Sequence, residues 1–195
     1  MIPTLMLLAC LDTVDGVTDP DDGGTADGGA GDGGALPCDL TGLDPDTLPR
    51  VDGACREPEL VVVTYVADGD TFVVDGSRGE ETVRFIGVNT PETGYGTTEE
   101  ECYGPEASDF THAAFPEGTC VWLTFDRDCI DPYDRTLAYV HLGAGEADFF
   151  ERRLLQGGYA EVMIYDPNDA FEDTFYADQD AARDAGLGLW GDCDG

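Results

Sequence analysis

Residues 60–88 read LVVVTYVADGDTFVVDGSRGEETVRFIGV, and this stretch decides the fold class. It contains three runs rich in β-branched and aromatic residues, at 60–67, 71–74 and 82–88. Asp-Gly pairs follow the first and second runs, and this dipeptide is a strong signal for a tight turn between antiparallel strands. The stretch therefore predicts a three-stranded meander.

The sequence after the meander predicts two more strands and three helices. In the meander's third run, Val83 and Phe85 should share one face, with Arg84 and Ile86 on the other. Further strands are expected at 120–125 and 135–142, with a short extended piece at 159–165. Helical spacing of apolar residues predicts helices at 105–115, 148–156 and 171–185. Five strands interleaved with three helices indicate an α+β protein, mainly β, built as a small barrel with packed helices.

The net charge is −33, from nine arginines, no lysine and 42 acidic residues. Residues 56–195 hold 31 of the acids and eight of the arginines, so this part alone carries −23. An acidic surface repels phosphate and normally argues against nucleic-acid binding. The acid excess fits adaptation to a salty environment. Codon bias would explain the missing lysines but not the additional acids.

The N-terminal residues are typical of an export signal. MIPTLMLLA is an apolar run too short to span a bilayer, and it ends at Cys10. The LLAC ending resembles a bacterial lipobox, so we expect a signal peptide at 1–9, lipidation of Cys10 and a membrane-anchored lipoprotein of the cell envelope. Because no basic residue precedes the run, plain secretion stays open. The Asp- and Gly-rich residues 10–36 predict a disordered linker.

Six of the seven cysteines remain once Cys10 is set aside. An even number suits three disulfides in an oxidising compartment, with free buried thiols as the alternative. Cys38 and Cys55 bracket a short segment at 37–56, outside the main domain at 57–193. We expect these two cysteines to pair with each other.

Oxygen-bearing side chains gather at the turns and strand ends of the meander. Asp70 lies in the first Asp-Gly turn, and Asn89 and Thr90 follow the third strand. A carboxylate, an amide oxygen and a backbone carbonyl near Thr90 are the ligands that a hard cation prefers. Such a cation polarises a phosphoryl oxygen and offsets developing negative charge.

Two arginines and a glutamate complete the chemistry of phosphodiester hydrolysis. Arg84 lies in the third strand, and Arg135 opens the fifth in the sequence DPYDR. Arginine forks hold phosphate oxygens at any working pH. Glu92, in NTPE, can accept the proton of an attacking water. Each residue alone has a simpler explanation as a turn, solvated or cross-strand residue, but their joint occurrence favours a functional site.

These residues, in this order, resemble the staphylococcal-nuclease-like (thermonuclease) family. The resemblance covers about residues 60–190. The matching stretches are VADGDTFVV (66–74), VRFIGVNTPET (83–93), CYGPEASDF (102–110), DPYDRTLAYV (131–140), RRLLQGGYAEV (152–162) and AARDAGLGLW (181–190).

The resemblance implies an OB-fold barrel and Ca²⁺-dependent cleavage of DNA or RNA, by an enzyme we expect to be a monomer. It carries catalytic roles over to Arg84, Glu92 and Arg135. It likewise makes Asp70 a calcium ligand and Thr90 the residue offering its carbonyl, and it places Tyr133 and Tyr165 against substrate. The choice between DNA and RNA stays open, as does that between calcium and another divalent cation.

Two departures from the family pattern affect the expected site. Asn89 stands where the best-known member of the family has a second aspartate ligand, so calcium should bind more weakly. The family's lysines around the nucleotide are replaced, with Pro132 and Asp166 in such places, so affinity for nucleic acid should be low. The alternative function is a catalytically weak or inactive OB-fold binding module of a surface lipoprotein.

Overall fold

The computed structural model describes residue 38 and residues 44–94 and 99–193. The predicted signal peptide, the predicted linker and Cys10 lie outside the described residues. Within the described part, no helix combines the length and the apolar character that a membrane span requires.

Five strands close into a barrel in the order β1–β2–β3–β6–β5. Their bounds are β1 (Glu59–Val66), β2 (Thr71–Gly76), β3 (Gly79–Phe85), β5 (Cys120–Thr124) and β6 (Thr136–His141). Neighbouring strands run antiparallel, except that β3 and β6 are parallel. The predicted meander and the five-stranded OB-type barrel are therefore confirmed.

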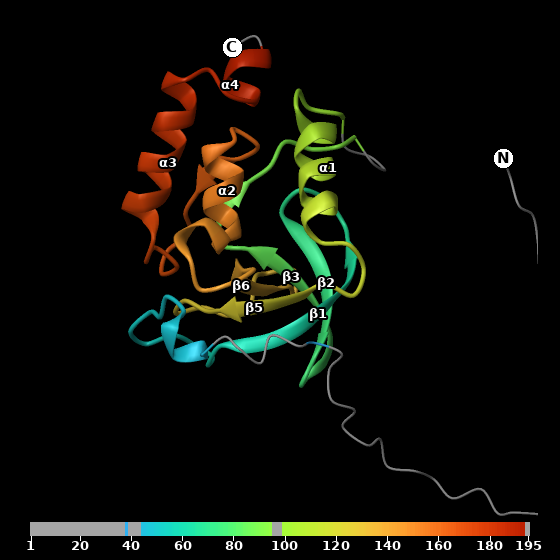
Figure 1. The fold of residues 1–195 in the computed structure, drawn as a ribbon, viewed down its shortest axis with the longest axis vertical. Helices are drawn as coiled ribbons and strands as arrows, with labels where there is room; N and C mark the ends of the chain where they lie inside the picture. The colour runs from blue at the N-terminus through green and yellow to red at the C-terminus, as the bar shows by residue number, and fades with distance from the viewer. Residues whose placement is uncertain (1–37, 39–43, 95–98, 194–195) are drawn as a thin grey trace, which may run out of the picture. The chain divides into compact units, whose positions relative to one another are not determined.

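Helices cover one side of this barrel (Figure 1). The predicted three are α1 (Gly104–Ala114), α2 (Phe150–Gln156) and α3 (Glu172–Asp184). A short α4 (Leu189–Asp192) and two 3₁₀ turns, η1 (Pro45–Thr47) and η2 (Glu146–Asp148), were not expected. A separate two-stranded ribbon joins β4 (Gly87–Asn89) to β7 (Glu161–Met163).

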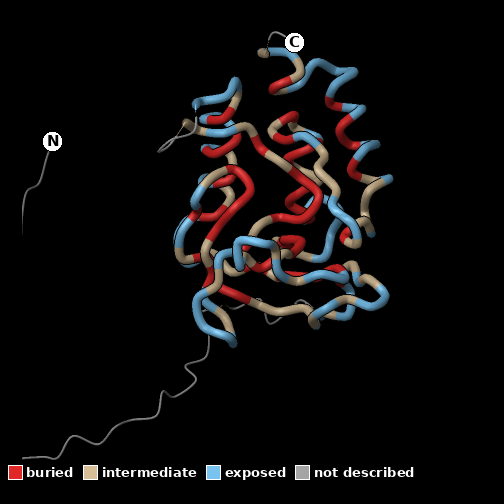
Figure 2. Tube along the Cα trace, turned by 180° about the vertical axis from the view of Figure 1, so that it is seen from behind, coloured by how far each residue is buried: buried red, intermediate tan, exposed pale blue. Residues whose placement is uncertain are grey.

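Aromatic rings fill the space between barrel and helices. Phe72 and Phe85 of the barrel meet edge to face, with ring centroids 4.8 Å apart. Phe115 lies 4.4 Å from Phe150 of α2, again edge to face. All four rings are buried. Figure 2 shows the buried backbone inside the barrel and on the inward turns of the helices, so α3 alternates buried and exposed stretches. This packing makes barrel and helices one rigid support for the residues at the strand ends.

The third strand is shorter at its end than predicted. It leaves the barrel after Phe85, and Gly87, with φ of +83°, starts β4 in a new direction. A Cβ at Gly87 would lie 2.5 Å from the Phe175 ring, so the turn needs glycine for its backbone angle and for space. Ile86 is buried and lies between β3 and β4, so the alternation predicted to run through residue 88 ends at Phe85. The bend carries Asn89 away from the barrel wall.

Three disulfides are present, as the even cysteine count predicted, but the Cys38–Cys55 pairing is wrong. The bonds join Cys38 to Cys120, Cys55 to Cys129 and Cys102 to Cys193. Each closes a loop of more than 70 residues. Long loops remove more entropy from the unfolded chain than a local Cys38–Cys55 bond would. The bonds tie the segment before β1 and the C-terminus to the rest of the domain.

Glu151 of α2 is a buried carboxyl group. Its two oxygens face the Val140 backbone N–H at 3.0 and 3.2 Å. Burial raises the pKa of Glu151 well above its ordinary value, against the smaller opposing effects of that hydrogen bond and of Arg84. The unfolded chain releases the Glu151 proton near the ordinary pKa of 4.5, whereas the folded chain releases it only at higher pH. Folding stability should therefore fall as pH rises above about 4.5.

Replacing Glu151 with glutamine should remove the loss of folding stability at higher pH, because the amide cannot ionise and still offers an oxygen to the Val140 N–H. We expect the free energy of unfolding of Glu151→Gln to exceed that of the parent by about 1 kcal/mol or more at pH 8, and by less at pH 5. Urea denaturation at both pH values measures it, with the exposed Glu117→Gln as control. Parallel pH profiles for Glu151→Gln and the parent would contradict the assignment.

Candidate active site

One cavity of about 930 Å³ opens where the meander, the β5–β6 loop and the turn after β7 meet. This volume lies in the range of small-ligand sites. Seven of the eight site residues predicted within the domain line it: Asp70, Arg84, Asn89, Glu92, Tyr133, Arg135 and Tyr165. The eighth, Thr90, does not line it, but is buried against Asp70.

Asp70 is fixed by the turn that carries it. Its backbone N–H donates to the Asp68 carboxylate at 3.0 Å. One oxygen of Asp70 accepts hydrogen bonds from the Thr90 backbone N–H at 2.9 Å and from the Thr90 hydroxyl at 3.3 Å. A Cβ at Gly69 would lie 2.6 Å from the Thr90 hydroxyl oxygen, so only glycine lets the turn approach this closely. The β1–β2 turn and the end of β4 therefore form one rigid corner.

Arg84 joins the same corner from β3. Its Nη2 lies 3.0 Å from an Asp70 carboxylate oxygen and donates to the Asn89 side-chain oxygen at 3.1 Å. Its Nη1 donates to the Phe85 carbonyl at 2.9 Å. The side chain is only 12% exposed, so Arg84 is not the solvated strand residue of the simpler explanation. It orients Asp70 and Asn89 together.

The Arg135 side chain is held through its Nε atom. Its Nε donates to Asp131 at 2.7 Å, and its guanidinium lies 5.5 Å from the centre of the Tyr133 ring. Among the described residues, neither terminal nitrogen of Arg135 has a hydrogen-bond partner. Since Arg135 lines the cavity and is 32% exposed, this end of the fork is available to a ligand.

Asp131 organises the loop that presents Arg135. One of its carboxylate oxygens accepts hydrogen bonds from the backbone N–H groups of Tyr133 and Arg135, at 2.8 and 2.9 Å. Burial alone would raise the pKa of Asp131, but these hydrogen bonds and the Arg135 guanidinium hold it below its ordinary value. Asp131 therefore stays ionised and keeps the loop closed.

Glu92 lines the cavity, and its backbone is held by two neighbouring residues. Its backbone N–H donates to the Glu101 carboxylate at 3.0 Å, and its carbonyl accepts from the Glu101 N–H at 2.9 Å. Gly104 packs directly on the Glu92 carbonyl, where a Cβ would lie 2.2 Å away. The backbone is thus fixed, while the exposed carboxylate has no hydrogen-bond partner among the described residues. Such a group can accept a proton from water.

Two exposed tyrosines form the rim. Tyr133 is 79% exposed and Tyr165 is 71% exposed. Both line the cavity, Tyr133 on the β5–β6 loop and Tyr165 on the turn after β7. Exposed aromatic rings beside a cavity can stack on nucleobases.

Oxygen donors in the corner fit a hard cation. The described residues contain no group of three or more histidine, cysteine, aspartate or glutamate side chains placed to hold a metal ion. The predicted ligands instead combine the Asp70 carboxylate, the Asn89 amide oxygen and the Thr90 carbonyl. Ca²⁺ accepts such mixed oxygen sets, and fewer carboxylates weaken its binding. These oxygen donors therefore fit calcium, and only one of the three, the Asp70 carboxylate, carries a negative charge.

A protein family described as staphylococcal nuclease homologue matches residues 82–192. This chain belongs to the staphylococcal nuclease family. The thermonuclease of Staphylococcus intermedius is 39% identical over 132 residues, covering 68% of this chain and 76% of the relative. The thermonuclease of Staphylococcus hyicus is 38% identical over 128 residues, which cover 66% of this chain and 73% of the relative. Endonuclease YncB of Bacillus subtilis is 34% identical over 139 residues, which cover 69% of this chain and 64% of the relative.

Sequence reasoning did not identify Asp68 or Asn168 as site residues of this nuclease-family chain. Asp68 was assigned only to a turn, but it lines the cavity. Burial and repulsion from Asp70 raise the pKa of Asp68 to about 6. Asn168 also lines the cavity, and its amide exchanges two hydrogen bonds with the Asp128 backbone, at 2.8 and 2.9 Å. The Asp-Gly-Asp spacing is a sequence signal that could have indicated Asp68, whereas no local pattern indicates Asn168.

Proposed function

We propose that this chain is a calcium-dependent nuclease that hydrolyses phosphodiester bonds of DNA or RNA outside the cytoplasm. Its family membership and its thermonuclease and endonuclease relatives make it a nuclease-type hydrolase. The metal, the residue roles and the compartment are the proposed part. The observation that carries them is the convergence of Arg84, Glu92 and Arg135 on one cavity beside Asp70 and Asn89.

The two arginines have different tasks in this proposal. Arg135 offers its two terminal nitrogens to the oxygens of the scissile phosphate, while Asp131 holds the guanidinium in place. Arg84 lies deeper, where its charge stabilises the negative charge that develops on the phosphoryl group. Preorganised donors of this kind need no rearrangement when the reaction occurs.

Glu92 acts as the general base. Its carboxylate receives a proton from the attacking water, and the resulting hydroxide adds to phosphorus as the ester bond to the leaving oxygen breaks. Asp70, Asn89 and the Thr90 carbonyl would hold the calcium ion. When bound, this ion supplies positive charge that polarises a phosphoryl oxygen. Tyr133 and Tyr165 stack on the bases beside the cut.

A binding module without strong activity is the second candidate. The net charge of −23 on residues 56–195 favours it, and so does the carboxylate beside each active-site arginine. Such carboxylates compete with a phosphate for the same guanidinium groups. Cleavage assays separate the two functions.

The deciding assay uses the purified chain with plasmid, single-stranded DNA and RNA, with Ca²⁺ or with a chelator. We expect cleavage with Ca²⁺ and none with chelator, at low or at high salt. The variant Arg183→Ala, whose arginine pairs with Asp180 on α3, serves as control and should retain activity. Absence of metal-dependent cleavage at every salt concentration would overturn the nuclease and favour the binding module instead.

Salt should affect this enzyme unusually. Most proteins lose affinity for nucleic acid steeply as salt rises, because counterions compete for phosphate. Here added ions also screen the repulsion between an acidic domain and its polyanionic substrate. We expect kcat/KM to stay flat or rise between ~0.05 and ~1 M NaCl. A steep fall across that range would contradict the prediction without affecting the nuclease assignment.

Export as a lipoprotein is part of the proposal. Three disulfides support an oxidising compartment. Detergent phase partition of the protein expressed in a bacterial host tests the anchor. The parent should enter the detergent phase and Cys10→Ser should not; partition of both into the aqueous phase would indicate plain secretion.

A further inference from the structure

We propose that Cys55 and Arg56 position the loop that presents Arg135, so that the segment before the barrel is a working part of the active site. The proposal rests on the proposed function, and it names two positioning residues for that reaction. Neither residue falls within the family match, which begins at residue 82.

The loop between β5 and β6 carries the groups that meet substrate. It runs from the end of β5 to Thr136, and it holds Asp131, Tyr133 and Arg135 at the cavity. Its inner hydrogen bonds join the Asp131 N–H to the Arg135 carbonyl at 3.0 Å and the Leu137 N–H to the Cys129 carbonyl at 2.8 Å. These bonds fix the shape of the loop. The β3–β6 ladder, which pairs Leu137 with Arg84, fixes the second end of the loop relative to β3, whereas the first half of the loop depends on other attachments.

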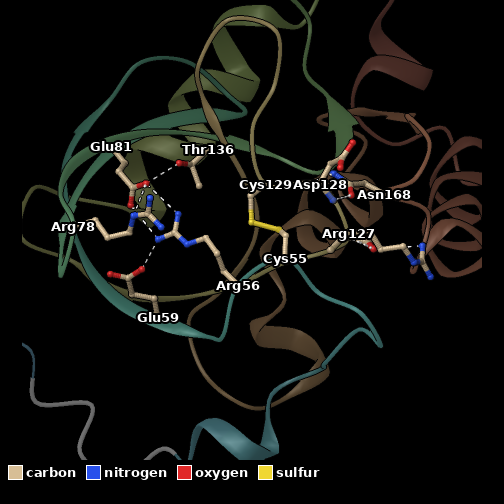
Figure 3. The surroundings of a disulfide bond; sticks show 11 residues. Cys55, Arg56, Glu59, Arg78, Glu81, Arg127, Asp128, Cys129, Thr136 and Asn168 are labelled. Atoms are coloured by element: carbon tan, nitrogen blue, oxygen red, sulfur yellow. Dashed lines mark hydrogen bonds and ion pairs between the residues drawn. A yellow bond between two sulfur atoms is a disulfide. The ribbon is translucent and has the colours of Figure 1, made fainter.

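Cys55 supplies two attachments to the first half of this loop. Its sulfur is bonded to Cys129, two residues before Asp131 (Figure 3). Its backbone N–H donates to the Asp126 carbonyl at 2.7 Å. The loop is therefore held at two points by one residue of another segment.

Arg56 supplies the attachment to the other end. Its Nη1 and Nη2 donate to the two oxygens of Glu81 on β3, at 3.0 and 3.2 Å. The Thr136 hydroxyl donates to Glu81 as well, at 2.9 Å. The Arg56 side chain is 12% exposed and its guanidinium lies 4.5 Å from the centre of the Phe125 ring. Glu81 thus joins the start of β6, next to Arg135, to the strand that carries Arg84, and Arg56 holds the Glu81 carboxylate in place.

The two attachments act on opposite ends of one loop. Figure 3 shows the disulfide between the Arg56–Glu59–Glu81 cluster and the Asp128–Asn168 pair. Because Cys55 and Arg56 are adjacent, a shift of this dipeptide moves both ends of the loop together. A displacement of about 1 Å at a reacting group can cost a hundredfold in rate. The dipeptide thereby acts together with the β3–β6 ladder in setting the distance between Arg135 and the Asp70–Arg84 corner.

The test removes the disulfide in the full chain and asks whether its effect passes through Arg135. Cys55→Ser/Cys129→Ser should lower kcat about tenfold with Arg135 present and less than about twofold in an Arg135→Ala background. The control Cys38→Ser/Cys120→Ser opens a loop of similar length, 82 against 74 residues, and should keep kcat. Equal losses of kcat in both backgrounds would mean a merely structural bond and would overturn the proposal.

A second pair of variants leaves the disulfide intact. Arg56→Gln should reproduce the same dependence on Arg135, with Arg78→Gln as matched control. Arg78 lies 3.8 Å from the same Glu81 carboxylate but is 60% exposed. A loss in Arg56→Gln that is independent of Arg135 counts against the proposal.

Hydrogen–deuterium exchange tests the anchor without any activity. Amides of residues 127–135 should exchange about tenfold faster in Cys55→Ser/Cys129→Ser than in the parent or the Cys38→Ser/Cys120→Ser control. Unchanged exchange overturns the anchor even in an active enzyme. If the parent cleaves no nucleic acid, the proposed function fails, and the exchange result alone decides whether Cys55 positions this loop.

Discussion

Replacing Arg135 with alanine is expected to lower kcat at least a hundredfold. The terminal nitrogens of Arg135 face the cavity without partners among the described residues, so the substitution removes donors that the proposed transition state needs. Lysine should restore little of the activity, because an ammonium group cannot form the paired hydrogen bonds of the arginine fork. The guanidinium is also tied to Asp131 at 2.7 Å, which lysine cannot reproduce in the same geometry.

Single-turnover cleavage of a single-stranded oligonucleotide measures this effect. Thermal unfolding must be recorded in parallel, since Arg135→Ala leaves the largely buried Asp131 without its ion pair. Arg183→Ala is the matched control, because its arginine pairs with Asp180 on the outer side of α3. A rate within about threefold of the parent, in a stably folded variant, would remove Arg135 from the proposed mechanism.

Replacing Glu92 with glutamine is the second change with a large expected effect, again about a hundredfold or more in kcat. Glutamine has nearly the same shape but accepts no proton at working pH. The Glu92 backbone is held by Glu101 and Gly104, so the substitution should leave the fold and substrate binding unchanged. KM should therefore change little.

The pH dependence of kcat distinguishes a base from a charge. The residual rate of Glu92→Gln should depend less on pH at the acidic end than the parent rate does, because glutamine accepts no proton. Glu100→Gln, an exposed neighbour in sequence, is the control and should behave like the parent. An acidic limb that persists in Glu92→Gln reports another group of the cavity, such as Asp68, whereas a Glu92→Gln rate near that of the parent would remove Glu92 as the base.

The barrel could be predicted because its strands are encoded locally. Val61, Val63, Phe72 and Val83 alternate with less buried neighbours, and Asp-Gly turns separate the first strands. The end of β3 was not encoded in this way. Its break depends on Gly87 meeting the Phe175 ring of α3, a contact between residues far apart in the chain. Short-range patterns carry no information about such contacts.

The cysteine pairing shows the same limit. Cys38 and Cys55 were paired because they are near in sequence, but each is bonded to a residue more than 70 positions away. Which cysteines meet depends on the path of the segment before β1 along the barrel. For example, the Cys55 N–H donates to the Asp126 carbonyl. No periodicity in residues 44–58 indicates that path.

The residues of the candidate site could be predicted from the sequence, but the ion pairs and hydrogen bonds between them could not. Strand ends and turns were the expected places for Asp70, Arg84, Glu92 and Arg135, and all four line one cavity. The direct Arg84–Asp70 ion pair was not foreseen. It arises because β2 and β3 pair Thr71 with Arg84, and the Phe85 N–H donates to the Asp70 carbonyl, so that Asp70 lies beside Arg84.

The central claim is that a divalent cation and the two arginines act on one phosphate group. A crystal structure of Glu92→Gln with Ca²⁺ and a single-stranded DNA oligonucleotide tests it most directly. We expect one phosphate whose oxygens accept hydrogen bonds from Arg84 and Arg135 and ligate a calcium ion that Asp70 and Asn89 also hold. A phosphate that contacts only one of the arginines, or a cation bound away from Asp70, would contradict the claim.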